Sequence, residues 1–99
     1  MKIFFLTLSV MQMAKSLFPN NLVLVPLIVA AIKKSNGRAH FKDIEDYVAT
    51  ELKLPDELRK MIRKGGRTEF AYRLSWARTA AVSEKLIKKD GAGYWTLSI

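Results

Sequence analysis

The 99-residue sequence predicts a mainly α-helical fold with a small β-wing: a winged helix-turn-helix with a three-helix core and a C-terminal β-hairpin. Apolar residues recur at helical spacing in three segments, glycine or proline separates those segments, and two short apolar runs end the chain around a glycine-containing turn. Since 49% of the residues are hydrophobic and the length suits one domain, we expect residues 17–99 to form a single core behind an apolar leader at residues 1–16.

The leader carries a mostly apolar run at residues 3–10, whose side chains would alternate between the two faces of a strand. It is therefore predicted to be an extra strand or a segment that pairs two chains. Two alternatives stay open: a secretory signal, although Gln12 and Met13 are not small, and a true start at Met11 or Met13, which would make the leader an artefact. The run is far shorter than the roughly 20 apolar residues of a membrane span, so no membrane partner is expected.

The first helix is predicted at residues 22–34, where Asn20 or Asn21 caps the start and the turn at residues 35–37 ends it. Its core-facing residues share a helical spacing and are Val25, Ile28, Val29 and Ile32. Pro26 costs the helix little if it lies in the first turn, where its missing N–H has no partner to lose. Residues 38–41 are too few for a helix and suit a short strand.

A second helix is predicted at residues 42–52, a short one from Asp56 to about Ile62, and a long one at residues 68–84. The apolar face of the second helix is Ile44, Tyr47, Val48 and Leu52, and that of the long helix is Phe70, Leu74, Ala77 and Ala81. The wing consists of two apolar runs within residues 86–98, joined by a turn in which Gly91 and Gly93 permit a positive φ.

Positive charge is concentrated at the start of the long helix. The chain has 17 Lys and Arg against 9 Asp and Glu, a formal net charge of +8. Residues 59–78 alone hold seven of the basic side chains and a single acid, Glu69. Such a stretch beside a helix that could enter a groove favours DNA phosphates as the partner, and a solvated basic face without a partner is the alternative.

The long helix carries hydroxyl-bearing side chains opposite its apolar stripe, which suits a helix that reads base edges in the major groove of double-stranded DNA. The residues expected nearest the bases are Arg67, Thr68, Tyr72, Ser75 and Thr79. The residues expected to hold phosphates, from the basic stretch and the wing, are Lys60, Arg63, Lys64, Arg73, Arg78, Lys88 and Lys89. An ordinary polar helix face is the alternative.

Two side chains of this helix have competing interpretations. Arg73 lies between core and surface, so it either holds a phosphate or forms an ion pair with the second helix, for instance with Asp46. Trp76 is expected to pack beneath the wing against Tyr94 or Trp95 rather than to contact DNA.

Composition excludes most enzyme chemistry. With no cysteine and His40 as the single histidine, the chain lacks thiol nucleophiles, zinc fingers and multi-histidine metal sites. Residues 51–53 read Glu-Leu-Lys, the short element of metal-dependent nucleases, but Asp43 and Asp46 share one predicted helix with it instead of lying on a neighbouring strand. We therefore expect a protein that is not an enzyme and that holds neither metal nor cofactor.

The segment from Gly66 to Thr79 resembles the N-terminal domain of Mrr-type restriction endonucleases. The shared residues, within a resemblance over about residues 18–97, are Arg73, Trp76-Ala77, Leu86-Ile87, Gly93 and Trp95-Thr96. The resemblance implies DNA binding without cleavage, because the nuclease domain that follows in the family has no counterpart in the sequence. Ala81, where the family tends to a larger apolar residue, and Glu84-Lys85, where it tends to a small pair, are departures that bear on the orientation of the wing.

The sequence thus predicts a cytoplasmic, nucleoid-associated DNA-binding module, with the helix at residues 68–84 in the major groove and the hairpin at residues 86–98 as the wing. The alternative is a docking or dimerisation module on the same scaffold, in which the basic face meets an acidic protein. A homodimer and a partner protein are therefore the predicted partners besides double-stranded DNA.

Overall fold

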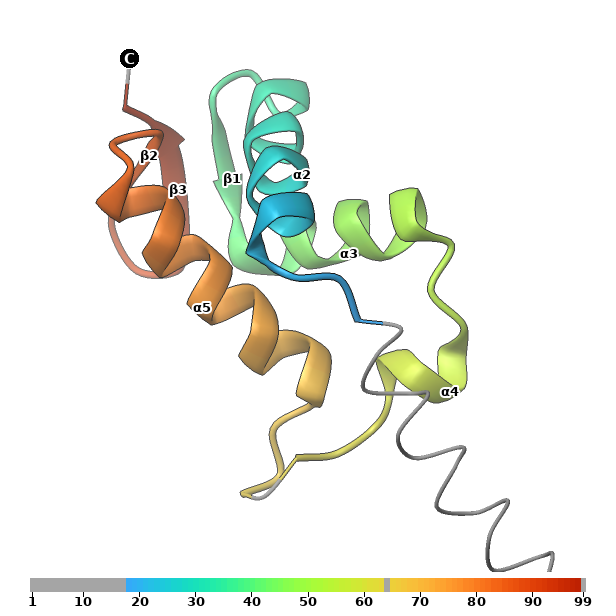
Figure 1. The fold of residues 1–99 in the computed structure, drawn as a ribbon. Helices are drawn as coiled ribbons and strands as arrows, with labels where there is room; N and C mark the ends of the chain where they lie inside the picture. Colours follow the sequence, from blue (N-terminus) through green and yellow to red (C-terminus); the bar gives the residue numbers. More distant parts are fainter. Residues whose placement is uncertain (1–17, 64, 99) are drawn as a thin grey trace, which may run out of the picture.

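The computed structural model describes residues 18–63 and 65–98. Along the chain, the elements are α2 (Asn21–Lys34), β1 (Arg38–His40), α3 (Phe41–Leu52), α4 (Asp56–Arg59), α5 (Glu69–Ser83), β2 (Ile87–Lys89) and β3 (Tyr94–Leu97) (Figure 1). This order confirms the predicted fold class, a mainly helical domain that ends in a β-wing. The leader at residues 1–16 and Lys64 lie outside the described residues, so what the sequence predicts for them stays a prediction. No helix of the described part is long and apolar enough to cross a membrane.

Side-chain N-caps mark the starts of α2 and α5, two helices of the core. The Asn20 side chain accepts a hydrogen bond from the N–H of Leu22 at 3.0 Å and caps α2. Thr68 Oγ1 accepts one from the N–H of Ala71 at 3.0 Å and caps α5. These bonds satisfy N–H groups that have no partner inside the first turn. Thr68 is therefore the cap of the long helix, one position before its first helical residue.

One core lies between α2, α3, α5 and the sheet, since α2 packs against both α3 and α5. The α5 residues expected to face it are all buried, namely Phe70, Leu74, Ala77 and Ala81. The buried members of the other two predicted stripes are Val25, Ile28, Ile32, Ile44 and Val48. The remaining members, Val29, Tyr47 and Leu52, are partly buried and pack against the edge of the same core.

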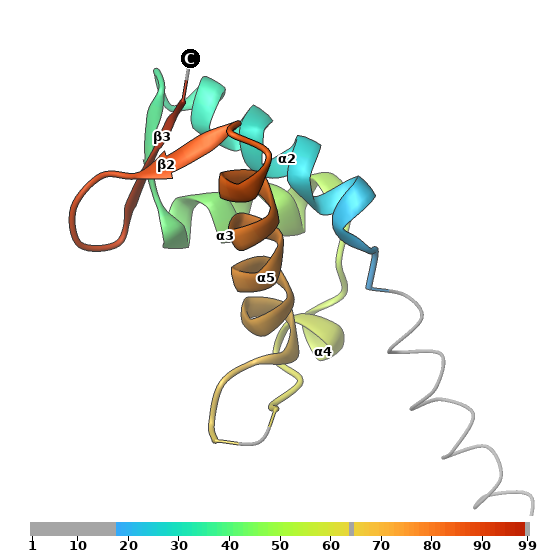
Figure 2. The ribbon, with the colours of Figure 1, turned by 60° about the vertical axis from the view of Figure 1, so that its left-hand side comes forward.

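β3 lies between β1 and β2 in a three-stranded antiparallel sheet. Trp95 of β3 lies opposite Ala39 of β1 and opposite Lys89 of β2. β1 thus adds a third strand to the predicted two-stranded wing, because the second edge of β3 carries backbone N–H and C=O groups that need partners. The β2–β3 loop projects to one side of α5 (Figure 2).

At two places the structure departs from what the sequence suggested. Pro26 lies in the interior of α2, beyond the first turn. At an interior position the proline ring and the missing N–H destabilise the helix by roughly 3 kcal/mol. Pro26 is exposed, so the helix is weakened on its solvent side and not in the core. The short helix α4 ends at Arg59 and not near Ile62, because Ile62 forms a β-bridge with Thr68.

Candidate nucleic-acid interface

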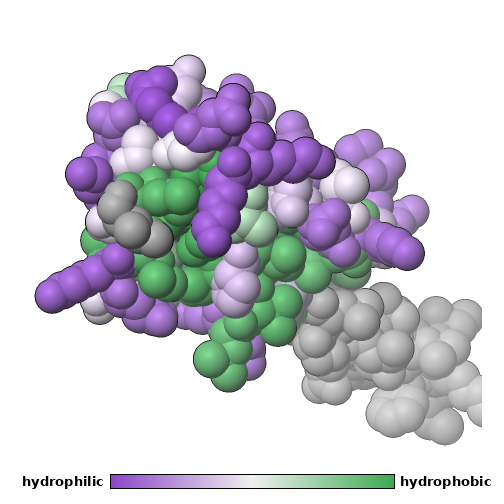
Figure 3. Space-filling model, turned by 90° about the horizontal axis from the view of Figure 1, so that it is seen from above, coloured by the Kyte–Doolittle hydropathy of each residue, from purple (hydrophilic) through white to green (hydrophobic). Residues whose placement is uncertain are grey.

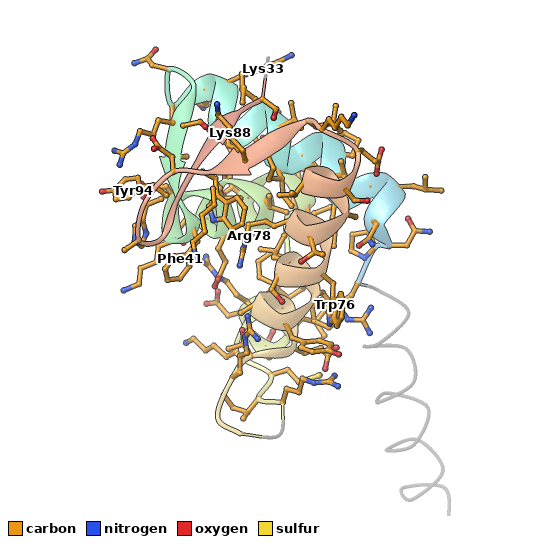
Figure 4. The ribbon with its side chains drawn as sticks, turned by 90° about the vertical axis from the view of Figure 1, so that its left-hand side faces the viewer. Lys33, Phe41, Trp76, Arg78, Lys88 and Tyr94 are labelled. Carbon is orange, nitrogen blue, oxygen red and sulfur yellow. The ribbon has the colours of Figure 1, made fainter. Side chains whose placement is uncertain are left out.

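A groove opens between α5, the start of α3 and the wing. Its volume is about 500 Å³, and the residues that line it are Phe41, Glu45, Arg67, Ala71, Arg78, Lys89, Gly93 and Trp95. Arg78 and Phe41 lie in the space between the hairpin and α5 (Figure 4). We call this feature the wing groove. Three of its lining residues are cations and one is an acid.

α5 contributes Ala71 and Arg78 to the wing groove, and Arg67 joins them from the segment just before the helix cap Thr68. Ala71 and Arg78 lie two turns apart, so their side chains share one side of the helix. Ala71 is the small residue between the two guanidinium groups. The helix surface between them is therefore open to an incoming backbone.

Arg78 is half-buried, whereas Arg67 and Lys89 are exposed. The Arg78 guanidinium lies 5.5 Å from the centre of the Trp95 ring, and its Nε is buried without a hydrogen-bond partner among the described residues. Burial lowers the pKa of Arg78 and the charge of Arg67 lowers it further, while the charge of Glu45 opposes both. An anion in the groove would accept hydrogen bonds from accessible guanidinium N–H groups and reduce the repulsion between the two arginines.

The wing lysines lie on opposite faces of the sheet, because successive side chains alternate along a strand. Lys89 lines the wing groove, and Lys88 lies opposite Thr96 and outside the groove lining. Lys60 follows α4, is exposed and does not line the groove either. Of these three predicted phosphate contacts, the structure brings only Lys89 next to the arginines of α5.

The other flank of α5 is organised by a buried carboxylate. Glu69 accepts a hydrogen bond from Arg63 Nη1 at 3.0 Å and another from Arg73 Nε at 2.9 Å. Burial raises the pKa of Glu69, but the hydrogen bonds and charges of Arg63 and Arg73 outweigh it and hold the pKa below its ordinary value of 4.5. We call Arg63, Glu69 and Arg73 the Glu69 flank. Its two arginines are already bound to a carboxylate.

The predicted ion pair between Arg73 and Asp46 is wrong. Glu69 lies one helical turn before Arg73, which places the two side chains next to each other on α5. Asp46 instead pairs with Arg59, the last residue of α4. Together with Arg63, three of the seven cations of residues 59–78 are therefore neutralised by acids.

Comparison with known proteins identifies the family of the domain that carries these two surfaces. The sequence model of the Mrr N-terminal domain matches residues 23–99, which include both the wing groove and the Glu69 flank. The chain belongs to the Mrr N-terminal domain family. Comparisons with curated proteins and with solved structures gave no match. Membership of this family indicates a module of the DNA-binding type from restriction systems.

Three of the four hydroxyl groups that the sequence placed nearest DNA bases, those of Thr68, Ser75 and Thr79, bond to the backbone of α5 in this Mrr N-terminal domain. Thr68 caps the helix, Ser75 Oγ donates to the carbonyl of Tyr72 at 2.7 Å, and Thr79 Oγ1 donates to the carbonyl of Ser75 at 3.1 Å. Thr79 is exposed, whereas Thr68, Tyr72 and Ser75 are half-buried. Each hydroxyl keeps acceptor lone pairs. The hydroxyl-bearing face is therefore present, but most of its residues are half-buried, and the hydroxyls of Ser75 and Thr79 already donate to the helix backbone.

Trp76 does not pack beneath the wing, so that expectation is wrong. Its side chain is 55% exposed, and its ring meets that of Tyr72 edge-on, with ring centres 6.2 Å apart. Arg78 takes the place beside Trp95. Residues two apart point about 200° away from each other around a helix, so Trp76 and Arg78 face different sides of α5 (Figure 4).

Sequence reasoning missed the side chains that line the wing groove between its cations, which are Phe41, Glu45, Ala71 and Trp95. Ala71 carried a signal, since its spacing from Arg78 places both residues on one face of the helix. Phe41 and Trp95 carried none. Both line the groove because β1 pairs with β3, and the N–H of Phe41 donates to the carbonyl of Gly93 at 2.8 Å next to that pairing.

Proposed function

We propose that this Mrr N-terminal domain binds double-stranded DNA at the wing groove, with α5 directed into the major groove and the β2–β3 hairpin against the neighbouring backbone. The observation that carries the proposal is Arg78, whose half-buried guanidinium no described carboxylate pairs with, in a groove that also holds Arg67 and Lys89. Phosphate oxygens are strong acceptors for guanidinium donors, and charge-assisted bonds of this kind fix a protein on a duplex.

The proposal assigns the phosphate contacts to cations that no carboxylate of the described chain holds. They are Arg67, Arg78 and Lys89 in the groove, with the exposed Lys60 and Lys88 outside it. Arg63 and Arg73 receive a structural role instead, because each is bonded to Glu69. Lys64 stays a predicted phosphate contact on the sequence alone.

Base contacts are assigned to the outer side of α5. Thr79 is exposed there, and its hydroxyl can accept a hydrogen bond from a base amino group while it donates to the carbonyl of Ser75. Tyr72 and Ser75 lie towards the helix start, and Arg67 and Thr68 come just before it. The start of a recognition helix is the part that approaches base edges most closely, which favours these residues.

Binding of a mixed-sequence duplex at several salt concentrations tests this function. Five phosphate contacts predict that the logarithm of the association constant falls against that of the salt concentration with a slope of about −4 to −5. Fluorescence anisotropy of a labelled duplex gives the slope directly. Binding that ignores salt, or none at low salt, would refute the proposal. Tight self-association or capture of an acidic protein without DNA affinity would favour the docking alternative.

We further propose that this domain binds DNA without cutting it. The test is incubation of supercoiled plasmid with the protein and Mg²⁺, which should leave the plasmid intact. Nicking that disappears in Glu51→Gln would overturn this part, because Glu51 belongs to the Glu-Leu-Lys element. The homodimer, the partner protein and the nucleoid location stay predictions, which sizing and cell fractionation can test.

A further inference from the structure

A second groove runs along α2 beside the end of α5. Its volume is about 740 Å³. Its apolar lining includes Leu22, Val25, Pro26, Val29 and Leu86. Along α2 the lining extends from Asn20 to Lys33. We call this feature the α2 groove, and none of its lining residues belongs to the wing groove.

The α2 groove leaves apolar surface in water. Leu22 in the groove is 84% exposed, and Val23, next to it in the chain but outside the groove lining, is 44% exposed. The space-filling view from above shows apolar side chains gathered on this part of the molecule between hydrophilic ones (Figure 3). Covering such surface is favourable by about 25 cal/mol for each Å² removed from water, and exposed apolar patches commonly mark interaction sites.

The described chain starts at one end of the α2 groove. Phe18 is only 5% exposed, and its ring lies 6.4 Å from that of Phe70. Two residues later, Asn20 both caps α2 and lines the groove. Residues 1–17 are therefore attached to the domain at a fixed point beside the groove.

Residues 1–17 suit the α2 groove in chemistry and in length. Six of the eight residues at positions 3–10 are apolar, and the only charged side chains of the segment are Lys2 and Lys15. From Asn20 to Lys33 the groove follows α2 for about 20 Å, at a rise of 1.5 Å per residue. Eight extended residues reach about 26 Å, which leaves residues 11–17 for the reversal of the chain.

We propose that the apolar run at residues 3–10 docks in the α2 groove of its own chain. Attachment through Phe18 gives the run an effective concentration in the millimolar range, which a free partner would have to exceed. The docked run would cover Leu22 and Val29. Because the α2 groove shares no residue with the wing groove, the docked state is compatible with DNA binding.

Disulfide cross-linking in the full chain tests this inference, since the sequence has no cysteine of its own. One variant carries Leu6→Cys with Val29→Cys, which joins the leader to the α2 groove. The matched control carries Leu6→Cys with Thr79→Cys, an exposed site on α5 outside the groove. At low protein concentration the first pair should form an intramolecular disulfide about tenfold faster than the control pair.

Two outcomes of this experiment overturn the proposal. Equal cross-linking rates for the two pairs would show that the leader does not occupy the α2 groove. Covalent dimers as the main product of the first pair would show that the groove takes the leader of a second copy. Mass spectrometry separates the two products, because only the second has twice the chain mass.

Proteolysis provides a second measurement that needs no cysteine. Docking should protect Phe4 and Phe5 from chymotrypsin in the native chain. Val29→Asp should accelerate their cleavage about tenfold, because a charge in the apolar groove expels the leader. Thr50→Asp, an exposed change on α3, should leave the rate unchanged. The same cleavage rate in all three proteins contradicts docking even if a cross-linking variant fails to fold.

Discussion

The two sides of α5 carry arginines in opposite states. On the Glu69 flank, Arg63 and Arg73 share one buried carboxylate, whose pKa they hold below its ordinary value. In the wing groove, Arg67 and Arg78 repel each other, and Arg78 has a buried Nε without a partner in the described chain. The arginines of the first side are paired with a carboxylate, whereas no described carboxylate pairs with those of the second side, which could therefore bind an anion.

This contrast shows that a local surplus of charge does not by itself identify a binding surface. All four arginines belong to the same basic stretch of the sequence. Their roles separate because Glu69 lies at the first helical position of α5, one turn from Arg73 and beside Arg63. One acid therefore removes two cations from the surface that DNA could use.

The largest expected effect comes from breaking the Glu69 flank. Glu69→Ala should lower the free energy of unfolding by roughly 2–4 kcal/mol, because it leaves two arginines without their shared carboxylate in a partly buried site. Urea unfolding followed by circular dichroism measures it. Glu84→Ala, the matched exposed acid after α5, should change stability by less than about 0.5 kcal/mol. Equal losses of unfolding free energy in both variants would show that the Glu69 flank does not stabilise the fold.

The next effect concerns the wing side. A Cβ on Gly93 would lie 2.8 Å from His40 Nε2 and 3.2 Å from the Phe41 ring, at a φ of +78°. Gly93→Ala should therefore lower stability by about 2 kcal/mol and weaken DNA binding, since the wing must shift. Gly91→Ala has the same kind of backbone, with φ +86° and no described atom within 4 Å, and should lose only about 1 kcal/mol. Similar losses would mean that the close approach at Gly93 has no influence.

A smaller effect follows from pH. The pKa of Glu69 is lowered in the folded protein, so its stabilising contribution is present above about pH 4.5 and is lost as the pH falls through that lowered pKa. The free energy of unfolding of the native chain should decrease more steeply between about pH 5 and pH 3 than that of Glu69→Gln. The same pH dependence of the unfolding free energy in the native chain and in Glu69→Gln would contradict the stabilising role of the Glu69 carboxylate.

The smallest effect is expected at the hydroxyl face. Thr79→Val should change affinity for a mixed-sequence duplex by less than about threefold, because the hydroxyl already donates to the helix backbone. A change in preference among defined duplexes would reveal direct base contact. Thr50→Val is the matched control, since Thr50 makes the same bond to the carbonyl of Asp46 on α3. Identical preferences in native chain and variant would remove Thr79 from the base-reading set.

The fold was predictable because it depends on local patterns. The α5 stripe from Phe70 to Ala81, the Asn20 cap and the glycine turn of the wing each follow from neighbouring residues. The site was predictable only in part. Arg73 bonds to Glu69 and Trp76 meets Tyr72, both neighbours on α5, and the position of the wing depends on the pairing of β1 with β3. The spacing of apolar residues determines neither of these.

The most direct test compares Arg78→Gln with Arg73→Gln in the salt dependence of duplex binding. If the wing groove binds the phosphates, Arg78→Gln should make the slope less steep by about 0.9, whereas Arg73→Gln should leave the slope as it is. Circular dichroism would first establish that both variants are folded. A slope reduced by Arg73→Gln and unchanged by Arg78→Gln would contradict the account and place the DNA on the Glu69 flank.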